Sequence, residues 1–273
     1  MRHLDAHTHF WQYDPLRDAW IGDDMRALQR DFLPQDLSPL LSENGFEGCI
    51  AVQADQSETE NDFLLQLAQQ HPCIKGVVGW IDLLSPAIEE KLQQKKQQPL
   101  LKGFRHILQG ERHRQYMLRP AFLNGVKALG RQGYSYDILI YPDQLGYALP
   151  FARCCNDQKL VIDHIAKPAI GRGERMQWEK EIRAFTSLDH VYCKLSGIVT
   201  ECDWKSWNRA QIAPYLETVL ETFGADRLLF GSDWPVCLLA AGYGQVAELA
   251  ASFLSEAEQQ KVFRQNIQEF YNC

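Results

Sequence analysis

Short apolar runs alternate with longer amphipathic segments along the whole chain. Eight of these runs are close to continuously apolar, which is typical of parallel strands buried on both faces. The predicted strands are Leu4–His7, Gly48–Gln53, Gly76–Trp80, Gly103–His106, Tyr136–Ile140, Leu160–His164, Val191–Leu195 and Leu228–Ser232. The runs therefore predict a parallel sheet.

The segments between the runs show helical spacing of their apolar residues. Pro120 stands at a favoured first-turn position, and Ser255 with Glu258 forms a capping-box pattern. The clearest predicted helices are Asn61–Gln70, Arg119–Arg131, Ala213–Phe223 and Ser255–Tyr271. Strands that alternate with helices predict an α/β fold, a single (β/α)₈ barrel of the TIM type over residues 1–273. An open doubly wound sheet is the alternative, but no Gly-x-Gly-x-x-Gly follows the first run.

Length, composition and charge narrow the class of protein. The 273 residues match one barrel of about 250 residues, and 45% hydrophobic with 23% charged residues is ordinary for a globular chain. A net charge of −7 without a basic run argues against nucleic-acid binding. We expect no membrane association, since no long apolar window occurs.

The N-terminus lacks the apolar stretch of a signal peptide, and the eight cysteines include no Cys-x-x-Cys. We therefore expect a cytoplasmic protein with reduced, buried thiols. The oligomeric state stays open, a homo-oligomer included.

Thr8 to Asp31 is long for a connection between a strand and a helix, and it is rich in aromatic residues. Loops after strand ends build the active sites of such barrels. A structural cap over the barrel mouth is an equally good interpretation.

Three short motifs place metal-ligand or base side chains at predicted strand ends. They are His7-x-His9, the Asp163-His164 pair, and Gly231-Ser232-Asp233-Trp234-Pro235. Each motif alone is weak, since a histidine near a strand end is often incidental and an aspartate before proline is common in turns. Together they fall at the carboxyl ends of the first, sixth and eighth strands, the face where barrel active sites lie.

Two chemistries suit this set. His7, His9, His164 and Asp233 could hold a cation such as Zn²⁺ with an open position for water. Alternatively, Asp233 acts as general base while the histidines, His164 among them, polarise an electrophile without metal.

The same motifs resemble the amidohydrolase superfamily, specifically its amidohydrolase-related (type 2) branch, and the resemblance runs from the first strand to the last helix. Gly103-Phe104-Arg105-His106-Ile107-Leu108-Gln109 and Asp163-His164-Ile165-Ala166-Lys167-Pro168 resemble its sugar-lactone hydrolases, the L-fuconolactone and L-rhamnonolactone group. The resemblance implies a (β/α)₈ barrel and attack by water on a carbonyl, with Asp233 as base. It also places His7, His9, His164 and Asp233 on the superfamily's metal-ligand positions.

The chain departs from the binuclear members of the superfamily. Those members bridge two metals through a Lys or Glu on the fourth strand and add a His on the fifth. Here the fourth run ends in Arg105-His106, and the fifth, Tyr136 to Tyr141, contains no histidine. One divalent metal or none remains open, because lactone-hydrolysing relatives manage without a required metal.

Several further residues are candidates for substrate binding. Polar side chains at predicted strand ends could bind hydroxyl groups or a developing carboxylate, and two aromatic rings could form a wall against sugar C–H groups. The polar candidates are Gln53, Arg105, His106, Tyr141 and Lys167, and the aromatic ones are Trp11 and Trp234. Ion pairing for Arg105 and core packing for the two tryptophans are the structural alternatives.

The leading functional hypothesis is a hydrolase that opens a sugar lactone such as L-fuconolactone. A zinc-dependent decarboxylase of the same branch would use the same ligands on an acidic unsaturated substrate. A barrel that only binds a ligand is the third hypothesis, which the presence of all four ligand-type residues disfavours.

Overall fold

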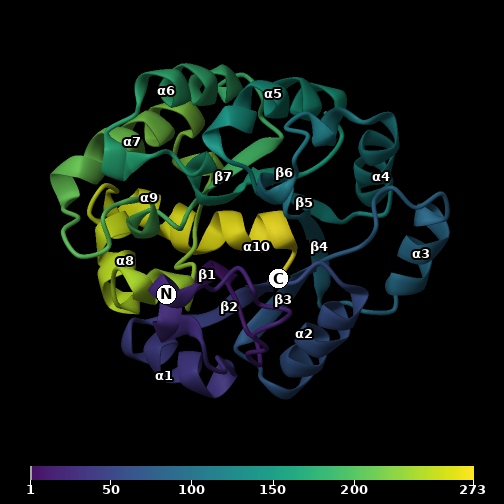
Figure 1. Ribbon diagram of the computed structural model, residues 1–273, viewed down its shortest axis with the longest axis horizontal. Coiled ribbons are helices and arrows are strands. Elements are labelled where there is room, and N and C mark those ends of the chain that lie inside the picture. Colours follow the sequence, from purple (N-terminus) through teal and green to yellow (C-terminus); the bar gives the residue numbers. More distant parts are fainter. Residues whose placement is uncertain (1) are drawn as a thin grey trace.

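The protein is a ring of eight parallel strands surrounded by helices, as the computed structural model of residues 2–273 shows (Figure 1). Neighbouring strands pair in chain order from first to last, and every pair is parallel. The strands are β1 (His3–Thr8), β2 (Phe46–Val52), β3 (Ile74–Gly79), β4 (Leu101–His106), β5 (Ser135–Ile138), β6 (Leu160–Ile162), β7 (Val191–Leu195) and β8 (Leu228–Phe230).

Hydrogen bonds between β1 and the segment that follows β8 close the ring. The amide of Asp233 donates to the carbonyl of His7 at 2.9 Å, and the amide of His9 donates to the carbonyl of Trp234 at 2.7 Å. These bonds confirm the predicted (β/α)₈ barrel. They also draw the His7-x-His9 motif and Asp233 to one place on the barrel rim.

The helices pack around the ring of strands or across its end, and all but one short helix near the C-terminus bury apolar side chains. They are α1 (Pro34–Glu43), α2 (Glu58–Gln70), α3 (Ile88–Lys95), α4 (Pro120–Arg131), α5 (Leu145–Cys154), α6 (Met176–Ile182), α7 (Arg209–Phe223), α8 (Tyr243–Ala251), α9 (Glu256–Gln260) and α10 (Asn266–Tyr271). The helix predicted over Ser255–Tyr271 is interrupted by a π-helical turn at Lys261–Gln265. Among residues 2–273, no helix has the length and apolarity needed to cross a bilayer.

The last helix, α10, crosses one end of the barrel (Figure 1). Its Ile267 and Phe270 pack with apolar side chains that fill the barrel interior, among them Leu4, Val161 and Leu229. The Lys102 ammonium, at the start of β4, donates to the carbonyl of Asn272 just after α10 at 2.9 Å. The helix therefore closes the end where the strands begin and leaves the opposite end open for a site.

Five strands end earlier than predicted: β2 and β3 by one residue, and β5, β6 and β8 by two residues, at Ile138, Ile162 and Phe230. The chain leaves the sheet after β5, β6 and β8 because the following residues turn over the barrel mouth. The eight cysteines, all within residues 2–273, form no disulfide, and four of them are buried.

Candidate active site

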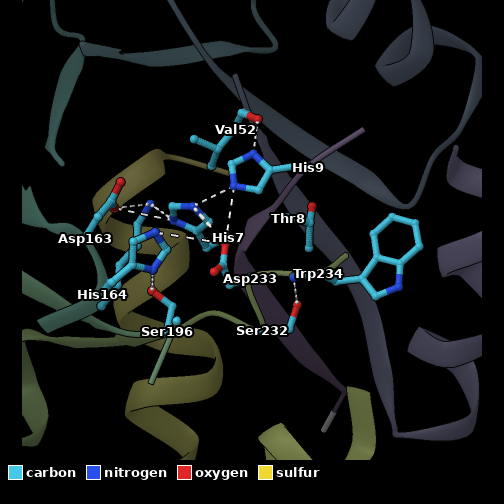
Figure 2. A network of polar contacts seen from close by, with 12 residues as sticks. His7, Thr8, His9, Val52, Asp163, His164, Ser196, Ser232, Asp233 and Trp234 are labelled. Atoms are coloured by element: carbon cyan, nitrogen blue, oxygen red, sulfur yellow. Dashed lines mark hydrogen bonds and ion pairs between the residues drawn. The ribbon is translucent and has the colours of Figure 1, made fainter. Parts of the chain in front are cut away.

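Four side chains meet at the carboxyl ends of the strands (Figure 2). His7 and His9 come from β1 and the residues after it, His164 follows β6, and Asp233 follows β8. One oxygen of Asp233 lies 3.4 Å from His9 Nε2, 3.8 Å from His7 Nε2 and 4.0 Å from His164 Nε2. All four residues are buried. The structure therefore brings together the four residues for which the sequence predicts metal binding or catalysis.

An irregularity in β1 helps to aim the first two histidines. Asp5 pairs with Cys49 and Thr8 with Ala51, so three steps along β1 oppose two along β2. A bulge of this kind changes which side chains face the interior. As a result the His7 ring follows the interior Ala6 and still points toward the barrel axis.

A left-handed turn carries His164. Four consecutive non-glycine residues, His164 to Lys167, have φ angles between 48° and 60°. L-residues lose roughly 1–2 kcal/mol each in this conformation. The amide of Lys167 closes the turn by donating to the carbonyl of His164 at 2.8 Å, and the Trp178 indole N–H holds the carbonyl of Ile165 at 2.8 Å. The turn directs both His164 and Lys167 into the cavity described below.

Polar contacts orient each imidazole. His9 Nδ1 donates to the carbonyl of Val52 at 2.8 Å, which leaves a lone pair on His9 Nε2. His7 Nδ1 lies 3.4 Å from the Asp163 carboxylate, and His164 Nδ1 lies 2.9 Å from Ser196 Oγ (Figure 2). Partners of this kind on the far nitrogen are typical of metal-binding histidines.

The donor set fits a divalent cation. One atom each of His7, His164 and Asp233 lie within 4.8 Å of one another. His9 Nε2 adds a further lone pair 3.2 Å from His7 Nε2. Imidazole nitrogens and a carboxylate oxygen are the ligands of catalytic Zn²⁺ sites, which keep one position open.

The charge states follow from burial and neighbours. Burial lowers the pKa of His164 to about 3, and burial together with the Lys194 ammonium lowers the pKa of His7 well below its usual value. Burial alone would raise the pKa of Asp233, but the imidazoles, led by His164, hold it below its usual value. At neutral pH the site therefore contains an ionised carboxylate beside neutral His7 and His164 rings.

A cavity of about 200 Å³ opens above these groups. Its lining includes His9, Arg105, His164, Lys167 and Asp233 among the residues singled out in the sequence. Its apolar wall consists of Trp20, Ala54, Ile107, Leu139 and Val236. A volume of this size suits a single small-molecule ring.

The aromatic candidates lie elsewhere. Trp11 and Trp234 are buried and pack against Phe32, and Trp234 points away from the imidazole cluster (Figure 2). The ring that lines the cavity is Trp20, which is 45% exposed. It belongs to the aromatic segment after β1, so that segment contributes to the cavity wall.

The polar candidates divide into those at the cavity and those beside it. Gln53 is fully buried, and its side-chain amide donates to the carbonyl of Arg105 at 3.1 Å. His106 contacts Glu111 at 2.8 Å and stacks on Tyr116, outside the cavity. Tyr141 is 41% exposed and lines a separate groove, which it shares with Lys167. Binding roles for these residues stay predictions.

A buried layer of charges supports the site from below. Lys194 on β7 is fully buried, and its ammonium lies 2.5 Å from Asp137 and 3.1 Å from Asp163. Arg105 pairs with the other oxygen of Asp163 at 3.1 Å, and the Tyr271 hydroxyl of α10 donates to Asp137 at 2.9 Å. Burial favours neutral carboxyl groups, but the cations lower the pKa of Asp163 well below its usual value.

The sequence interpretation missed this layer. Asp137 and Lys194 each interrupt an apolar strand run, and a charge in such a run needs a partner. That signal identifies both residues as interior groups. Gln109 was missed as well: it lines the cavity, and its buried side-chain oxygen Oε1 has no hydrogen-bond partner.

The chain is similar in sequence to known proteins. The Amidohydrolase family pattern matches residues 4–273. An L-fucono-1,5-lactonase of Burkholderia multivorans is 42% identical over 93% of this chain and 90% of its own length. The L-fucono-1,5-lactonase of Burkholderia ambifaria is 33% identical over 98% of this chain and 94% of its own.

Solved structures superpose on this fold. An amidohydrolase of Burkholderia multivorans with bound Zn superposes with a TM-score of 0.95 at 39% identity, covering 100% of this chain and 99% of that one. A 2,6-dihydroxybenzoate decarboxylase from Rhizobium, 16% identical with a TM-score of 0.69, covers 100% of this chain and 99% of its own and shares the fold alone. The chain belongs to the amidohydrolase family and is a hydrolase of that family.

Proposed function

We propose that this protein hydrolyses a sugar lactone, with an L-fuconolactone-type aldonolactone as the substrate class. The observation that carries the proposal is the Asp233 carboxylate held among three imidazoles at the floor of a cavity of about 200 Å³. The L-fucono-1,5-lactonases that share 42% and 33% of its residues support the choice of substrate.

The reaction needs a base for water and donors for the carbonyl oxygen. Asp233 accepts a proton from water as the water oxygen attacks the lactone carbonyl carbon. The C–O bond of the ring then breaks, and the proton on Asp233 passes to the departing ring oxygen. The products are the open hydroxy acid and, after ionisation, its carboxylate.

Positive and polar groups at the cavity suit this course. Lys167 and Arg105 line the cavity and can stabilise negative charge on the carbonyl oxygen and on the carboxylate product. The unpartnered side-chain oxygen Oε1 of Gln109 can accept a hydrogen bond from a sugar hydroxyl, and Trp20 can cover the C–H face of the sugar ring.

We also propose zinc as the metal that this donor set would hold, through His7, His9, His164 and Asp233. When bound, it would polarise the carbonyl and lower the pKa of a water molecule. We propose that the ion is dispensable for activity. We also propose that the enzyme acts in carbohydrate metabolism and, because its cysteines are unpaired, that it is cytoplasmic.

A proton-release assay over a panel of aldonolactones, with and without prior chelation, tests the proposed function. The panel varies ring size and the configuration of each hydroxyl, and an Asp233→Asn preparation sets the background. We expect saturable hydrolysis of at least one sugar lactone that persists after chelation.

Two results would count against the proposal. Rates equal to the Asp233→Asn background on every lactone would remove the lactonase assignment. Release of CO₂ from an aromatic or unsaturated acid, abolished by chelation, would favour a decarboxylase instead.

A further inference from the structure

The His7 imidazole lies between two basic side chains in the barrel interior. On one side, its Nδ1 is 3.4 Å from Asp163 Oδ1 and 3.1 Å from the Lys194 ammonium. On the other side, its Nε2 is 3.2 Å from Arg105 Nη1. His7 is fully buried, so no solvent separates it from these charges.

The contact with Arg105 places a fixed positive charge against one nitrogen of the His7 ring. A guanidinium group has only donors, so in the tautomer with the ring proton on Nδ1 it presents an N–H to the lone pair of His7 Nε2. In the other tautomer, Nδ1 accepts from the Lys194 ammonium and the Nε2 proton faces His9 Nε2, and the Arg105 charge still lies 3.2 Å from His7 Nε2. The Lys194 ammonium also donates to Asp137 and forms an ion pair with Asp163 on the Nδ1 side.

The His7 nitrogen that Arg105 faces is the one a metal ion would need. His7 Nε2 faces Asp233 and His9, at 3.8 and 3.2 Å, and those groups complete the donor set. A cation coordinated there would also lie close to a fixed positive charge, which is unfavourable in a buried site.

Arg105 is anchored in this position. Its other terminal nitrogen donates to the backbone carbonyl of Gln53 and contacts the Gln53 side-chain oxygen at 3.4 Å. Nη1 also donates to Asp163 at 3.1 Å. With partners just after β2 and just after β6, the guanidinium cannot leave His7 without breaking several buried hydrogen bonds.

We propose that Arg105 is a built-in competitor of the metal ion: its anchored guanidinium faces His7 Nε2 with N–H groups and positive charge and thereby lowers the affinity of the site for zinc. The role does not depend on which substrate the cavity takes. It makes Arg105 a positioning residue for His7, in addition to any contact with substrate.

Zinc affinity of the full chain, measured by competition with a chromophoric chelator at neutral pH, tests the proposal. Arg105→Met removes the donors and the charge at similar length. Lys167→Met is the matched control, since Lys167 is a cation of the same cavity that pairs with Glu201 at 3.4 Å. We expect Arg105→Met to bind zinc at least tenfold more tightly than the wild type, and Lys167→Met to stay within threefold.

Arg105 also neutralises buried Asp163, so Arg105→Met is measured together with Arg105→Lys. A lysine keeps a charge beside Asp163, but its single nitrogen cannot span Asp163, Gln53 and His7, so tighter zinc binding is again expected. The zinc affinity of the Arg105 variant that retains the native circular dichroism spectrum decides whether the proposal holds. Unchanged or weaker zinc binding in a folded Arg105 variant, or an equal gain in Lys167→Met, would overturn the proposal.

Discussion

At the scale of single residues, the Asp233 carboxylate is the group whose basicity the proposed reaction requires. Asp233→Asn keeps the shape of the side chain but removes the acceptor for the proton of water. General bases contribute about 10²–10⁴-fold, so we expect kcat to fall by roughly that factor with KM little changed. Steady-state kinetics on the best lactone checks this. A variant with near-normal kcat would leave His164 as the base.

Glu60 is a buried carboxyl outside the catalytic cluster that makes stability depend on pH. It is 7% exposed and accepts a hydrogen bond from the amide of Ala54 at 2.7 Å, and burial raises its pKa to about 7. Because the folded-state pKa is raised, the folded chain binds the proton more tightly than the unfolded chain does. The stability from this group is therefore complete below the ordinary pKa of 4.5 and is lost as the pH rises through about 7.

Glu60→Gln keeps the acceptor oxygen and removes this titration. Between pH 4.5 and 7.5 the wild type should lose about 3 kcal/mol of unfolding free energy relative to the variant, from a pKa shift of this size. Urea denaturation of both proteins over that range measures the difference. Parallel stability curves would show that the carboxyl titrates alike in both states.

At the scale of elements, the loop after β7 sets the position of the His164 ring. Gly197 has a φ of 60°, and a Cβ there would lie 2.6 Å from His164 Nδ1. Gly197→Ala therefore adds a collision with the imidazole to the strain of a positive φ. Gly133→Ala is the matched control, since Gly133 has a φ of 82° and open space around the added carbon.

We expect Gly133→Ala to cost about 1 kcal/mol of stability and to leave kcat/KM unchanged. Gly197→Ala should cost more and lower kcat/KM at least tenfold, because His164 must move away from Asp233. Thermal unfolding and lactone kinetics of the two variants are the measurements. Equal activity in both would mean that the His164 position does not matter for the reaction.

At the scale of the whole molecule, the buried charge layer joins β4, β5, β7, the turn after β6 and α10. Removing Lys194 leaves Asp137 and Asp163 with fewer partners in a region without solvent. Loss of one member of a buried ion pair costs about 3–5 kcal/mol, and we expect Lys194→Met to lose unfolding free energy in that range. Chemical denaturation checks this value.

Two further variants make the Lys194 result specific. Lys180→Met alters an exposed lysine on α6 and should change stability by less than about 0.5 kcal/mol. Adding Asp137→Asn to Lys194→Met removes one of the stranded carboxylates and should recover part of the loss. A double variant less stable than the sum of the single changes would contradict the ion-pair interpretation.

The order of strands and helices was predictable from the chain alone, because helical and strand periodicities are local properties of the sequence. The apolar runs marked all eight strands, and parallel strands in a barrel bring their carboxyl ends to one face. That rule placed His7, His9, His164 and Asp233 together, although they are up to 226 residues apart.

Only the tertiary structure decided which neighbouring side chains face the cavity and which face the core. The bulge in β1 and the left-handed turn at His164–Lys167 reset the side-chain directions that a regular period of two would predict. Trp20 lines the cavity while Trp11 is in the core, although both belong to one aromatic segment. The ion pairs of Lys194 and Arg105 connect different strands, so they form only when the ring closes. Local sequence determines periodicity, but contacts between distant strands determine orientation and charge pairing, and those contacts exist only in the folded barrel.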